Sequence, residues 1–309
     1  MTYTADIITG GPCQNDALLN SFMATVATAK ATVPEAHLLW LGGNCAPGPI
    51  EDYFKAFLAT FGYEYVRIEE PYNCARWWIL GKELTAAKWG GEFTVFAACD
   101  LLFHPGWLDN IVDLWRSNPD YFCLAPFSWG RLHHTGLNYR SDDLKPRREI
   151  LPCDHPAPWC FVRRRDDDYV PDLRFKDWNV EFDFYEWMKF HGRKAGVCLN
   201  ARVDHTGYGP RRLGDFGFDL NANITEGKAL FDEKWNTAHL EGQWVSTEDG
   251  RGYAAPLTRQ ELAAPGDMNG SRAMIGGEHF IIERLRLPGH VPPWRRGEPI
   301  VYFLKKDSP

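Results

Sequence analysis

The chain lacks the features that would place it at once in several broad classes of protein. It has no apolar run near the roughly 20 residues that a helix needs to span a bilayer. Its polar first residues do not form the charged-then-apolar pattern of a signal peptide. None of the eight cysteines forms a CxxC pair, the usual spacing of a redox or zinc-binding dithiol. We therefore expect a soluble, cytoplasmic protein with free thiols and no transmembrane segment.

Positive charge is also scarce, because 34 Lys and Arg residues stand against 41 Asp and Glu residues. This balance disfavours a generally basic surface for nucleic acid or membranes. Apolar sequence, in contrast, is sufficient for a sizeable core, since 44% of the residues are hydrophobic and only 24% are charged. The length of 309 residues allows one large α/β domain with an appendage, or two modest domains.

The first hundred residues alternate between two hydrophobic patterns. Short apolar runs predict strands, and segments with apolar residues three and four apart predict the helices between them. Such alternation predicts a Rossmann-like, mostly parallel central sheet flanked by helices on both faces. The predicted strands are residues 5–9, 37–41, 65–68 and 92–96, and the predicted helices are 18–26, 53–61 and 75–88.

The rest of the chain gives a weaker pattern. Residues 127–158 are rich in His, Arg, Gly and Pro, which suggests loops over a site. From about residue 236, Gly, Pro and charged residues predict a less regular C-terminal extension. Between these regions, we predict helices at 107–115 and 181–191, strands at 161–162 and 195–199, and a loop at 203–210.

Ligands of parallel α/β sheets bind beyond the carboxyl ends of the strands. Asp100 stands at such an end, directly after a buried strand. A carboxylate there can hold a divalent cation against a diphosphate, and the cation would neutralise charge on a departing nucleotide. The other segments expected at this edge are residues 9–12, 42–45 and 71–76.

Several short motifs accompany Asp100 in a fixed order. Phe161-Val162-Arg163-Arg164 precedes Pro171-Asp172-Leu173-Arg174-Phe175, and Glu181-Phe182-Asp183-Phe184 opens a helix that ends in Phe190-His191-Gly192-Arg193-Lys194. Val203-Asp204-His205-Thr206-Gly207 then follows a strand. The stretch 94–108 and the later Phe231-Asp232-Glu233-Lys234-Trp235 complete the set of motifs. Their order along the chain resembles that of the inverting nucleotide-sugar glycosyltransferases of family two, which have the GT-A fold. The resemblance covers about residues 3–236.

The resemblance implies an enzyme that moves a hexose-like sugar from a nucleotide sugar, most simply a UDP-sugar, to an acceptor hydroxyl with inversion. It implies Mn²⁺ or Mg²⁺ as cofactor and a saccharide or other hydroxyl-bearing molecule as acceptor. Residues 1–236 would form the GT-A catalytic domain, with 1–125 binding the donor and 126–236 the acceptor. The extension at 237–309 has no counterpart in the resemblance.

By position, the resemblance makes Asp100 and His205 candidate metal ligands, and a neutral imidazole suits Mn²⁺. Glu181 is the candidate general base, with Asp183 as the alternate, because an inverting transfer needs a carboxylate to accept the proton of the acceptor hydroxyl. Both acids stand at a predicted helix start, where the helix dipole favours the charged form. Trp159 is a candidate part of the acceptor wall.

The candidate donor-binding residues come from the four strand ends: Thr9, Gly10, Pro12, Gly42, Asn44, Asn73, Arg76, Cys99 and Asp100. Arg76 could pair with phosphate. The sequence departs from the family pattern at two positions. Gly42 or Gly43 stands where the family has an acid that contacts the base, and Ala98 replaces the first acid of the metal motif.

Two other functions compete with glycosyl transfer. Nucleotidyl transfer on a similar fold would need more acids at the metal and a basic, Gly-rich loop, and Gly10-Gly11-Pro12 lacks that basic partner. A non-catalytic sugar- or nucleotide-binding protein would fit the departures at Gly42 and Ala98. A modified nucleic-acid base is a less favoured acceptor; it would use the basic residues between Arg131 and Arg148, or Arg163 to Arg165.

Overall fold

A computed structural model of the chain describes residues 3–43, 46–127, 146–153, 156–157, 159–177, 179–207 and 220–242, together with four later strands. The chain separates into two compact units, Met1–Gly227 and Lys228–Pro309. The domain boundary that we predicted at residue 236 stays a prediction. No helix in the described ranges is both long and apolar enough to cross a membrane.

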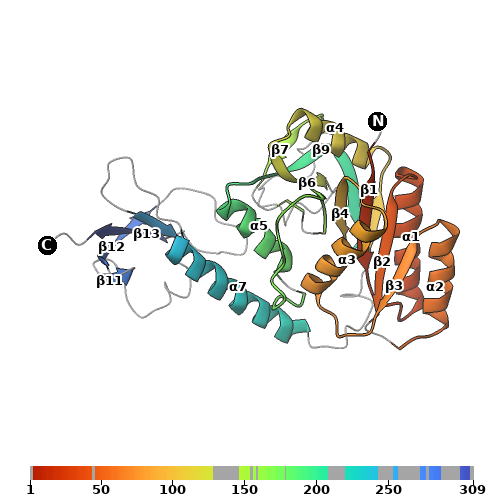
Figure 1. The fold of residues 1–309 in the computed structure, drawn as a ribbon, viewed down its shortest axis with the longest axis horizontal. Coiled ribbons are helices and arrows are strands. Elements are labelled where there is room, and N and C mark those ends of the chain that lie inside the picture. Colours follow the sequence, from red (N-terminus) through yellow and green to blue (C-terminus); the bar gives the residue numbers. More distant parts are fainter. Residues whose placement is uncertain are drawn as a thin grey trace. The chain divides into compact units, whose positions relative to one another are not determined.

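The first unit is built around a nine-stranded sheet (Figure 1). The strand order is β3-β2-β1-β4-β8-β6-β9-β5, with β7 also pairing with β9. The strands are β1 (Ala5–Gly10), β2 (His37–Gly43), β3 (Glu64–Ile68), β4 (Phe93–Ala97), β5 (Leu101–Phe103), β6 (Tyr121–Phe127), β7 (Ile150–Pro152), β8 (Cys160–Arg164) and β9 (Lys194–His205).

The predicted α/β class is confirmed, and the sheet is mixed rather than parallel throughout. The pairs β1–β2, β2–β3 and β1–β4 are parallel, as the alternating sequence predicted. Strand β8 then runs antiparallel to both β4 and β6, while β6 and β9 are parallel. The strands at whose ends we predicted donor binding, β1 to β4, therefore form the parallel part of the sheet.

Two helices of the first unit begin at asparagine caps, and a third begins with proline. Asn15 and Asn73 cap α1 and α3, because each side-chain oxygen accepts a backbone N–H three residues on. Pro49 occupies the first turn of α2, and Gly62 follows its end with φ of 72°. The helices are α1 (Asp16–Thr32), α2 (Pro49–Thr60), α3 (Cys74–Lys88), α4 (Trp107–Ser117) and α5 (Val180–Phe190), followed by α7 (Leu220–Gly242).

The helices cover both faces of the parallel strands. Helix α3 packs so closely on β1 that a Cβ at Gly81 would lie 2.5 Å from the side chain of Ile8. On the other face, the fully buried ring of Trp40 contacts Phe22 of α1 and Phe54 of α2, with both centroid distances at 4.7 Å. Full burial of an aromatic side chain contributes roughly 1.5–3 kcal/mol, so this cluster is a main source of stability.

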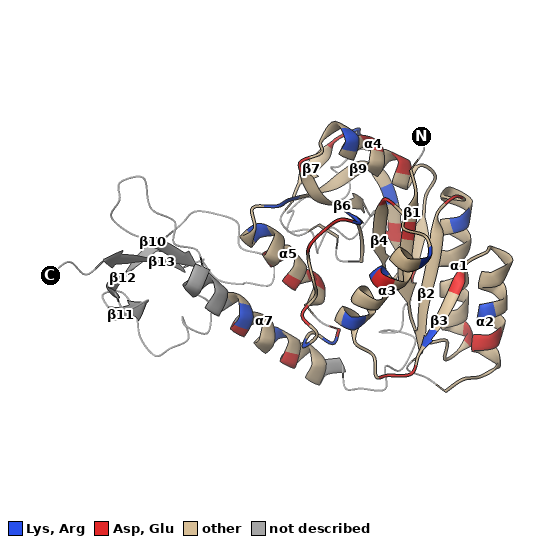
Figure 2. Ribbon diagram, viewed as in Figure 1, with Lys and Arg blue, Asp and Glu red and all other residues tan. Residues whose placement is uncertain are grey.

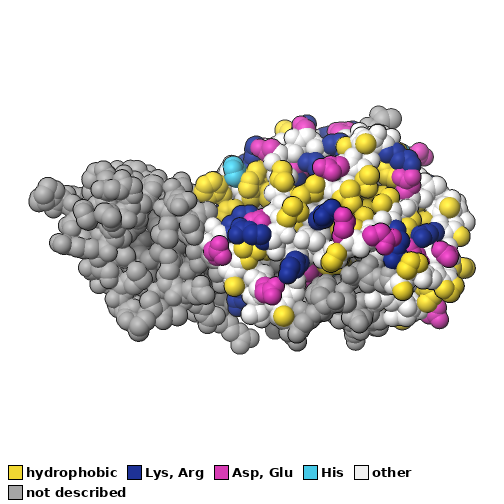
Figure 3. Space-filling view, turned by 60° about the horizontal axis from the view of Figure 1, so that its bottom comes forward, with side chains coloured by type: hydrophobic (Ala, Val, Ile, Leu, Met, Phe, Trp, Pro, Cys, Tyr) yellow, Lys and Arg dark blue, Asp and Glu magenta, His cyan; other side chains and the backbone are white. Residues whose placement is uncertain are grey.

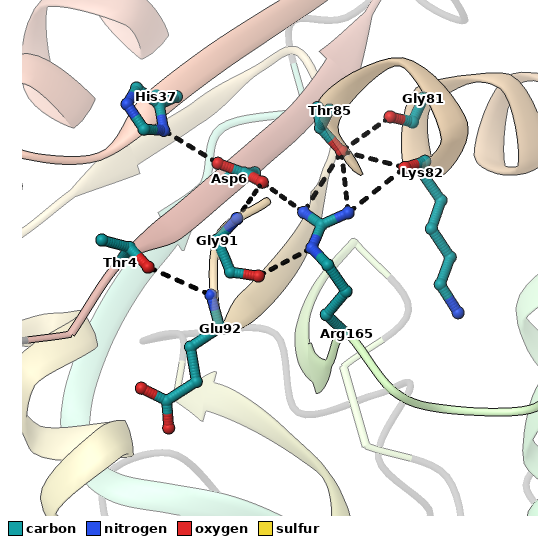
Figure 4. Close-up of polar contacts among 9 residues, drawn as sticks. All are labelled: Thr4, Asp6, His37, Gly81, Lys82, Thr85, Gly91, Glu92 and Arg165. Atoms are coloured by element: carbon teal, nitrogen blue, oxygen red, sulfur yellow. Dashed lines mark hydrogen bonds and ion pairs between the residues drawn. The ribbon is translucent and has the colours of Figure 1, made fainter. Parts of the chain in front are cut away.

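A buried charge cluster closes the amino ends of the central strands (Figure 4). Asp6 is fully buried at the start of β1; it accepts the backbone N–H of Gly91 at 2.9 Å and pairs with His37 and Arg165. Arg165 also donates to the Thr85 hydroxyl of α3. The cluster lies at the edge of the sheet opposite the strand ends that carry Asp100, so it serves to fix β1, β2 and α3 together.

Two segments that we predicted as loops contain strands, namely 127–158, which includes β7, and 203–210. We expected a loop at residues 203–210, but residues 203–205 continue β9 as a single strand from Lys194. The reason is pairing with β5, which extends β9 beyond its pairing with β6 and β7. The partner β5 has only three residues, which is too short to give a periodic signal in the sequence.

The second unit contains a four-stranded antiparallel sheet in the order β10-β13-β12-β11. Its strands are β10 (Tyr253–Pro256), β11 (Arg272–Ile275), β12 (Glu278–Arg286) and β13 (Ile300–Lys306). Sequence reasoning predicted only a less regular extension here, because frequent Gly and Pro concealed the strand pattern.

Candidate functional site

Asp100 stands in the turn between β4 and β5, at the carboxyl end of a buried parallel strand. The residue is 4% exposed. Its carbonyl oxygen accepts hydrogen bonds from both the backbone N–H and the hydroxyl of Thr206, each at 3.0 Å. Two residues earlier, the N–H of Ala98 donates to the carbonyl oxygen of Trp159 at 2.7 Å. The turn is therefore held by β8 and β9 as well as by its own strand.

The pairing of β5 with β9 brings His205 to this turn. Leu101 lies opposite His205 in the antiparallel register, so the imidazole is next to the residue that precedes Leu101. The Nε2 atom of His205 lies 3.2 Å from Oδ1 of Asp100, and the His205 side chain is 23% exposed. The two residues that we predicted as metal ligands thus lie together, although they are far apart in the sequence.

Trp159, the candidate for the acceptor wall, lies against the same pair. Its ring stacks on the imidazole of His205 with a centroid distance of 5.8 Å and an interplanar angle of 15°. Trp159 is buried. A flat aromatic neighbour restricts the rotation of the imidazole, which fixes the direction in which Nε2 points.

The donor atoms of the pair suit Mn²⁺ or Mg²⁺ only in part. A carboxylate oxygen and a neutral imidazole nitrogen are both ligands that Mn²⁺ accepts, whereas Mg²⁺ prefers oxygen alone. Across the described part of the chain, no group of three or more His, Cys, Asp and Glu side chains is arranged to hold a metal. Two protein ligands would leave most coordination positions open to the oxygens of a bound diphosphate.

The two candidate bases occupy different surroundings on α5. Asp183 is fully buried and accepts a hydrogen bond from the Tyr169 hydroxyl at 2.8 Å. Burial, followed by the nearby Asp183 charge, raises the pKa of Tyr169 well above its usual value. An acceptor molecule has no access to a carboxylate that is enclosed in this way. The geometry therefore assigns Asp183 a place in the interior.

Glu181 is only partly buried and lies about 200° around the helix from Asp183. Its charge contributes, after burial, to raising the pKa of Tyr185. The Tyr185 hydroxyl donates to the carbonyl oxygen of Ala157 at 3.1 Å, two residues before Trp159. Of the two acids, Glu181 is the one whose side chain is partly exposed.

The glycines at the ends of β1 and β2 have a packing reason that sequence alone did not reveal. A Cβ at Gly10 would collide with the carbonyl oxygen of Leu41 and lie 2.7 Å from the ring of Trp77. A Cβ at Gly42 would collide with the hydroxyl end of Tyr65. Among the other candidate donor-binding residues, Thr9, Pro12 and Cys99 are buried.

Asn73 and Arg76 lie at the start of α3, where we predicted contact with a diphosphate. The Asn73 side chain caps the helix through the N–H of Arg76 and donates to the carbonyl oxygen of Leu173 at 2.8 Å. Arg76 pairs with Glu70 at 2.8 Å, and both side chains are half exposed. Arg76 therefore retains exposed surface for phosphate, while both polar ends of the Asn73 side chain already have partners.

A contact that the sequence did not predict joins α3 to the segment before α5. The Tyr72 hydroxyl donates to the buried carboxylate of Asp177 at 3.1 Å, and the N–H of Cys74 donates to the carbonyl oxygen of Lys176. Two residues beyond Asp177, Asn179 begins α5 with a left-handed φ of 71°. This segment connects the predicted phosphate-binding end of α3 with the helix that carries Glu181.

A second His–Asp pair lies on the same β5–β9 ladder. Nε2 of His104 is 2.8 Å from Asp204, which also binds Arg202. Burial alone would raise the pKa of Asp204, but the bonds from Arg202 and His104 outweigh it and hold that pKa below its usual value. Neighbouring residues of a strand point to opposite faces, so this pair is turned away from the Asp100–His205 pair. It offers a matched control.

Some predicted site residues lie outside the described ranges, namely Asn44 and the basic residues from Arg131 to Lys145. Acidic and basic residues are interspersed along the described helices and strands (Figure 2). The face drawn in Figure 3 likewise mixes Lys and Arg with Asp and Glu where it is described. The described part of that face has no continuous basic surface of the kind that binds nucleic acid.

No protein-family model matches the chain, and neither does any curated protein. Among solved structures, the chain is similar to GalNAc-T7 in complex with UDP, GalNAc and Mn²⁺, with a TM-score of 0.50 and 13% sequence identity. The similarity covers 66% of this chain and 44% of that chain, so it spans less than half of the length of that protein. At this identity the similarity shows the fold alone, and it confirms the predicted GT-A fold.

Proposed function

We propose that the chain is a metal-dependent glycosyltransferase that moves a sugar from a nucleotide-sugar donor to an acceptor hydroxyl. The observation that carries the proposal is the approach of Asp100 and His205 to 3.2 Å at the carboxyl end of β4. A carboxylate and an imidazole at this edge of a GT-A sheet suit a divalent cation, and ligands of α/β sheets bind at this edge. A fold similar to that of GalNAc-T7 with UDP and Mn²⁺ supports the same reading.

In this proposal, Asp100 and His205 hold Mn²⁺, or less readily Mg²⁺. The bound cation would neutralise the charge that develops on the leaving diphosphate. Trp159 keeps the imidazole in position by stacking on it. The fixed peptide groups around Asp100 keep the carboxylate in place, so little reorganisation is needed when the donor binds.

Glu181 is the proposed general base. Its carboxylate accepts the proton of the acceptor hydroxyl while the hydroxyl oxygen bonds to the anomeric carbon of the sugar. The bond from that carbon to the diphosphate oxygen breaks in the same step, the nucleoside diphosphate leaves, and the configuration inverts. The partly exposed position of Glu181 at the start of α5 supports this role over that of the enclosed Asp183.

The proposed donor is a UDP-sugar, bound along the ends of β1 to β4 within the proposed catalytic domain of residues 1–236. The proposed acceptor is a saccharide, since the similar structure contains GalNAc. A modified nucleic-acid base is less favoured, because the described part of the visible face is not basic. Inversion is part of the proposal, and it requires Glu181 to accept the proton on the face of the sugar opposite the diphosphate.

The proposal is tested with a panel of nucleotide sugars, first by thermal shift with Mn²⁺ and then by release of the nucleoside diphosphate. We expect a UDP-sugar to stabilise the chain only when Mn²⁺ is present, and to be cleaved slowly in water. Release of pyrophosphate would indicate nucleotidyl transfer. Binding without any cleavage or transfer would indicate a non-catalytic protein.

Two substitutions on the same ladder make the test specific. Asp100→Asn removes the carboxylate charge from the proposed metal site, whereas Asp204→Asn does the same to the other His–Asp pair. We expect Asp100→Asn to abolish Mn²⁺-dependent UDP release and Asp204→Asn to leave it intact. Equal activity in both variants would contradict the proposal.

A further inference from the structure

We propose that Thr25 of α1 is a positioning residue for the carboxylate of Asp100. The inference rests on the proposed function, because it assumes that Asp100 binds the metal. Thr25 lies in the middle of α1 and was not among the predicted site residues. Its hydroxyl reaches across to the β4–β5 turn and bonds to the peptide groups on both sides of Asp100.

In these two bonds the single hydroxyl of Thr25 acts once as a donor and once as an acceptor. The Thr25 Oγ1 atom accepts the backbone N–H of Leu101 at 3.0 Å and lies 2.9 Å from the carbonyl oxygen of Cys99, to which it donates. It also lies 3.2 Å from the carbonyl oxygen of Ser21 in its own helix. The shorter contact is the one to the turn, so the hydroxyl serves the turn in preference to the helix.

Burial makes these bonds effective. Thr25 is 1% exposed and Asp100 is 4% exposed, so water cannot easily replace the hydroxyl. Loss of the Thr25 hydroxyl would leave the buried N–H of Leu101 and the buried carbonyl of Cys99 without this partner. Buried backbone groups require partners, so the turn would shift or open to find them.

The turn is thereby fixed by three separate elements. Helix α1 holds the peptide groups of Cys99 and Leu101 through Thr25, β9 holds the carbonyl of Asp100 through Thr206, and the residue before β8 holds Ala98. Thr206 adjoins His205 and so belongs to the site itself. Thr25 contributes from a different layer of the molecule and acts only through the backbone of the turn.

Thr25 thus supports the proposed metal ligand Asp100 through the backbone and does not itself bind the metal. Partners that orient a ligand are needed because a cation tolerates only small errors in ligand position, and their loss typically weakens metal affinity about 10- to 100-fold. With two protein ligands, the placement of one carboxylate has a large share in the total affinity. Thr25 therefore tunes the distance between Asp100 and His205.

The inference is tested by direct measurement of Mn²⁺ binding in the presence of UDP, using the electron paramagnetic resonance signal of free Mn²⁺. Thr25→Val keeps the shape and removes both bonds, and we expect its Mn²⁺ affinity to fall about 10- to 100-fold. Thr25→Ser restores the hydroxyl, and we expect it to recover most of the affinity. Should Thr25→Val not fold, Thr25→Ala replaces it in the comparison with Thr25→Ser.

Thr28 supplies a matched control on the same helix. Its hydroxyl accepts the N–H of Phe103 at 3.2 Å, so it also supports the segment after β4, but beyond Asp100. We expect Thr28→Val to destabilise the fold as Thr25→Val does while retaining Mn²⁺ affinity. An equal loss of Mn²⁺ affinity in Thr25→Val and Thr28→Val would contradict the positioning role and show that Thr25 only stabilises the fold.

The two proposals fail in different ways. Unchanged Mn²⁺ binding in Thr25→Val, with binding still lost in Asp100→Asn, overturns the positioning role and leaves the proposed function standing. Absence of Mn²⁺ binding by the natural chain with UDP overturns the proposed function and this inference together.

Discussion

The two acids of α5 offer the sharpest test of how the site is built. We predict that Glu181→Gln abolishes transfer without affecting stability, whereas Asp183→Asn lowers stability without abolishing transfer. The reason is their surroundings, because Asp183 is fully enclosed and bonded to Tyr169, while Glu181 is partly exposed. Each substitution removes one charge and keeps the shape of the side chain.

The size of each effect follows from the contacts. A hydrogen bond to a charged group contributes roughly 1.5–3 kcal/mol, and each kcal/mol shifts the melting temperature of a unit of this size by about 2–4 °C. Asp183→Asn keeps an oxygen that can accept the Tyr169 hydroxyl and loses only the charge, a difference of about 1–1.5 kcal/mol, so it should melt about 2–6 °C lower than the natural chain. Glu181→Gln should melt at nearly the same temperature while its transfer rate falls about 10²- to 10⁴-fold, the usual contribution of a general base.

The assay pairs thermal melting, followed by circular dichroism, with the rate of Mn²⁺-dependent transfer per folded molecule. Tyr169→Phe is the control, because it removes the partner of Asp183 and leaves both carboxylates in place. It should destabilise the chain as Asp183→Asn does and retain transfer. Loss of transfer in Asp183→Asn at an unchanged melting temperature, with Glu181→Gln still active, would refute the assignment.

Two further predictions concern the parallel half of the sheet. Burial alone would raise the pKa of Glu51, but hydrogen bonds led by Lys55 and Arg67 outweigh it and hold that pKa below its usual value. The stability from Glu51 is therefore present above about pH 4.3 and lost as pH falls through the folded-state pKa, so Glu51→Gln should lower the urea midpoint at pH 7 far more than at pH 3. Gly10→Ala should cost about 1–3 kcal/mol of stability, because its Cβ would meet a backbone oxygen that cannot move aside. Gly48→Ala, which meets no atom within 4 Å, should cost less in the same urea titration, and equal losses would contradict the packing argument.

Much of the first half of the fold was predictable because its signals are local. Apolar runs marked β1 to β4, and apolar residues three and four apart marked the helices between them. These features depend on neighbours within a few residues, so periodicity reveals them. The three-residue strand β5 gave no such signal, and the apolar pair at 161–162 predicted β8 without its antiparallel direction, since pairing depends on distant segments.

The sequence allowed us to name the main residues of the site, but not the side chains that pack around them. Asp100 could be found from its place after a buried strand, and His205 came from the family resemblance rather than from any local pattern. The enclosure of Asp183 could not be predicted, because Tyr169 closes over it from a segment without periodic structure. Thr25 gave no signal at all, since a threonine within an amphipathic helix is unremarkable in sequence.

By itself, the sequence determined the alternation of strands and helices and put an acid at the tip of the fourth strand. Only the tertiary structure decided which histidine meets that acid. The antiparallel register sets Leu101 opposite His205, and a slip of one residue would turn His205 to the other face and bring Asp204 in its place. Register depends on contacts between distant segments, so it belongs to the folded molecule and cannot be derived from either strand alone.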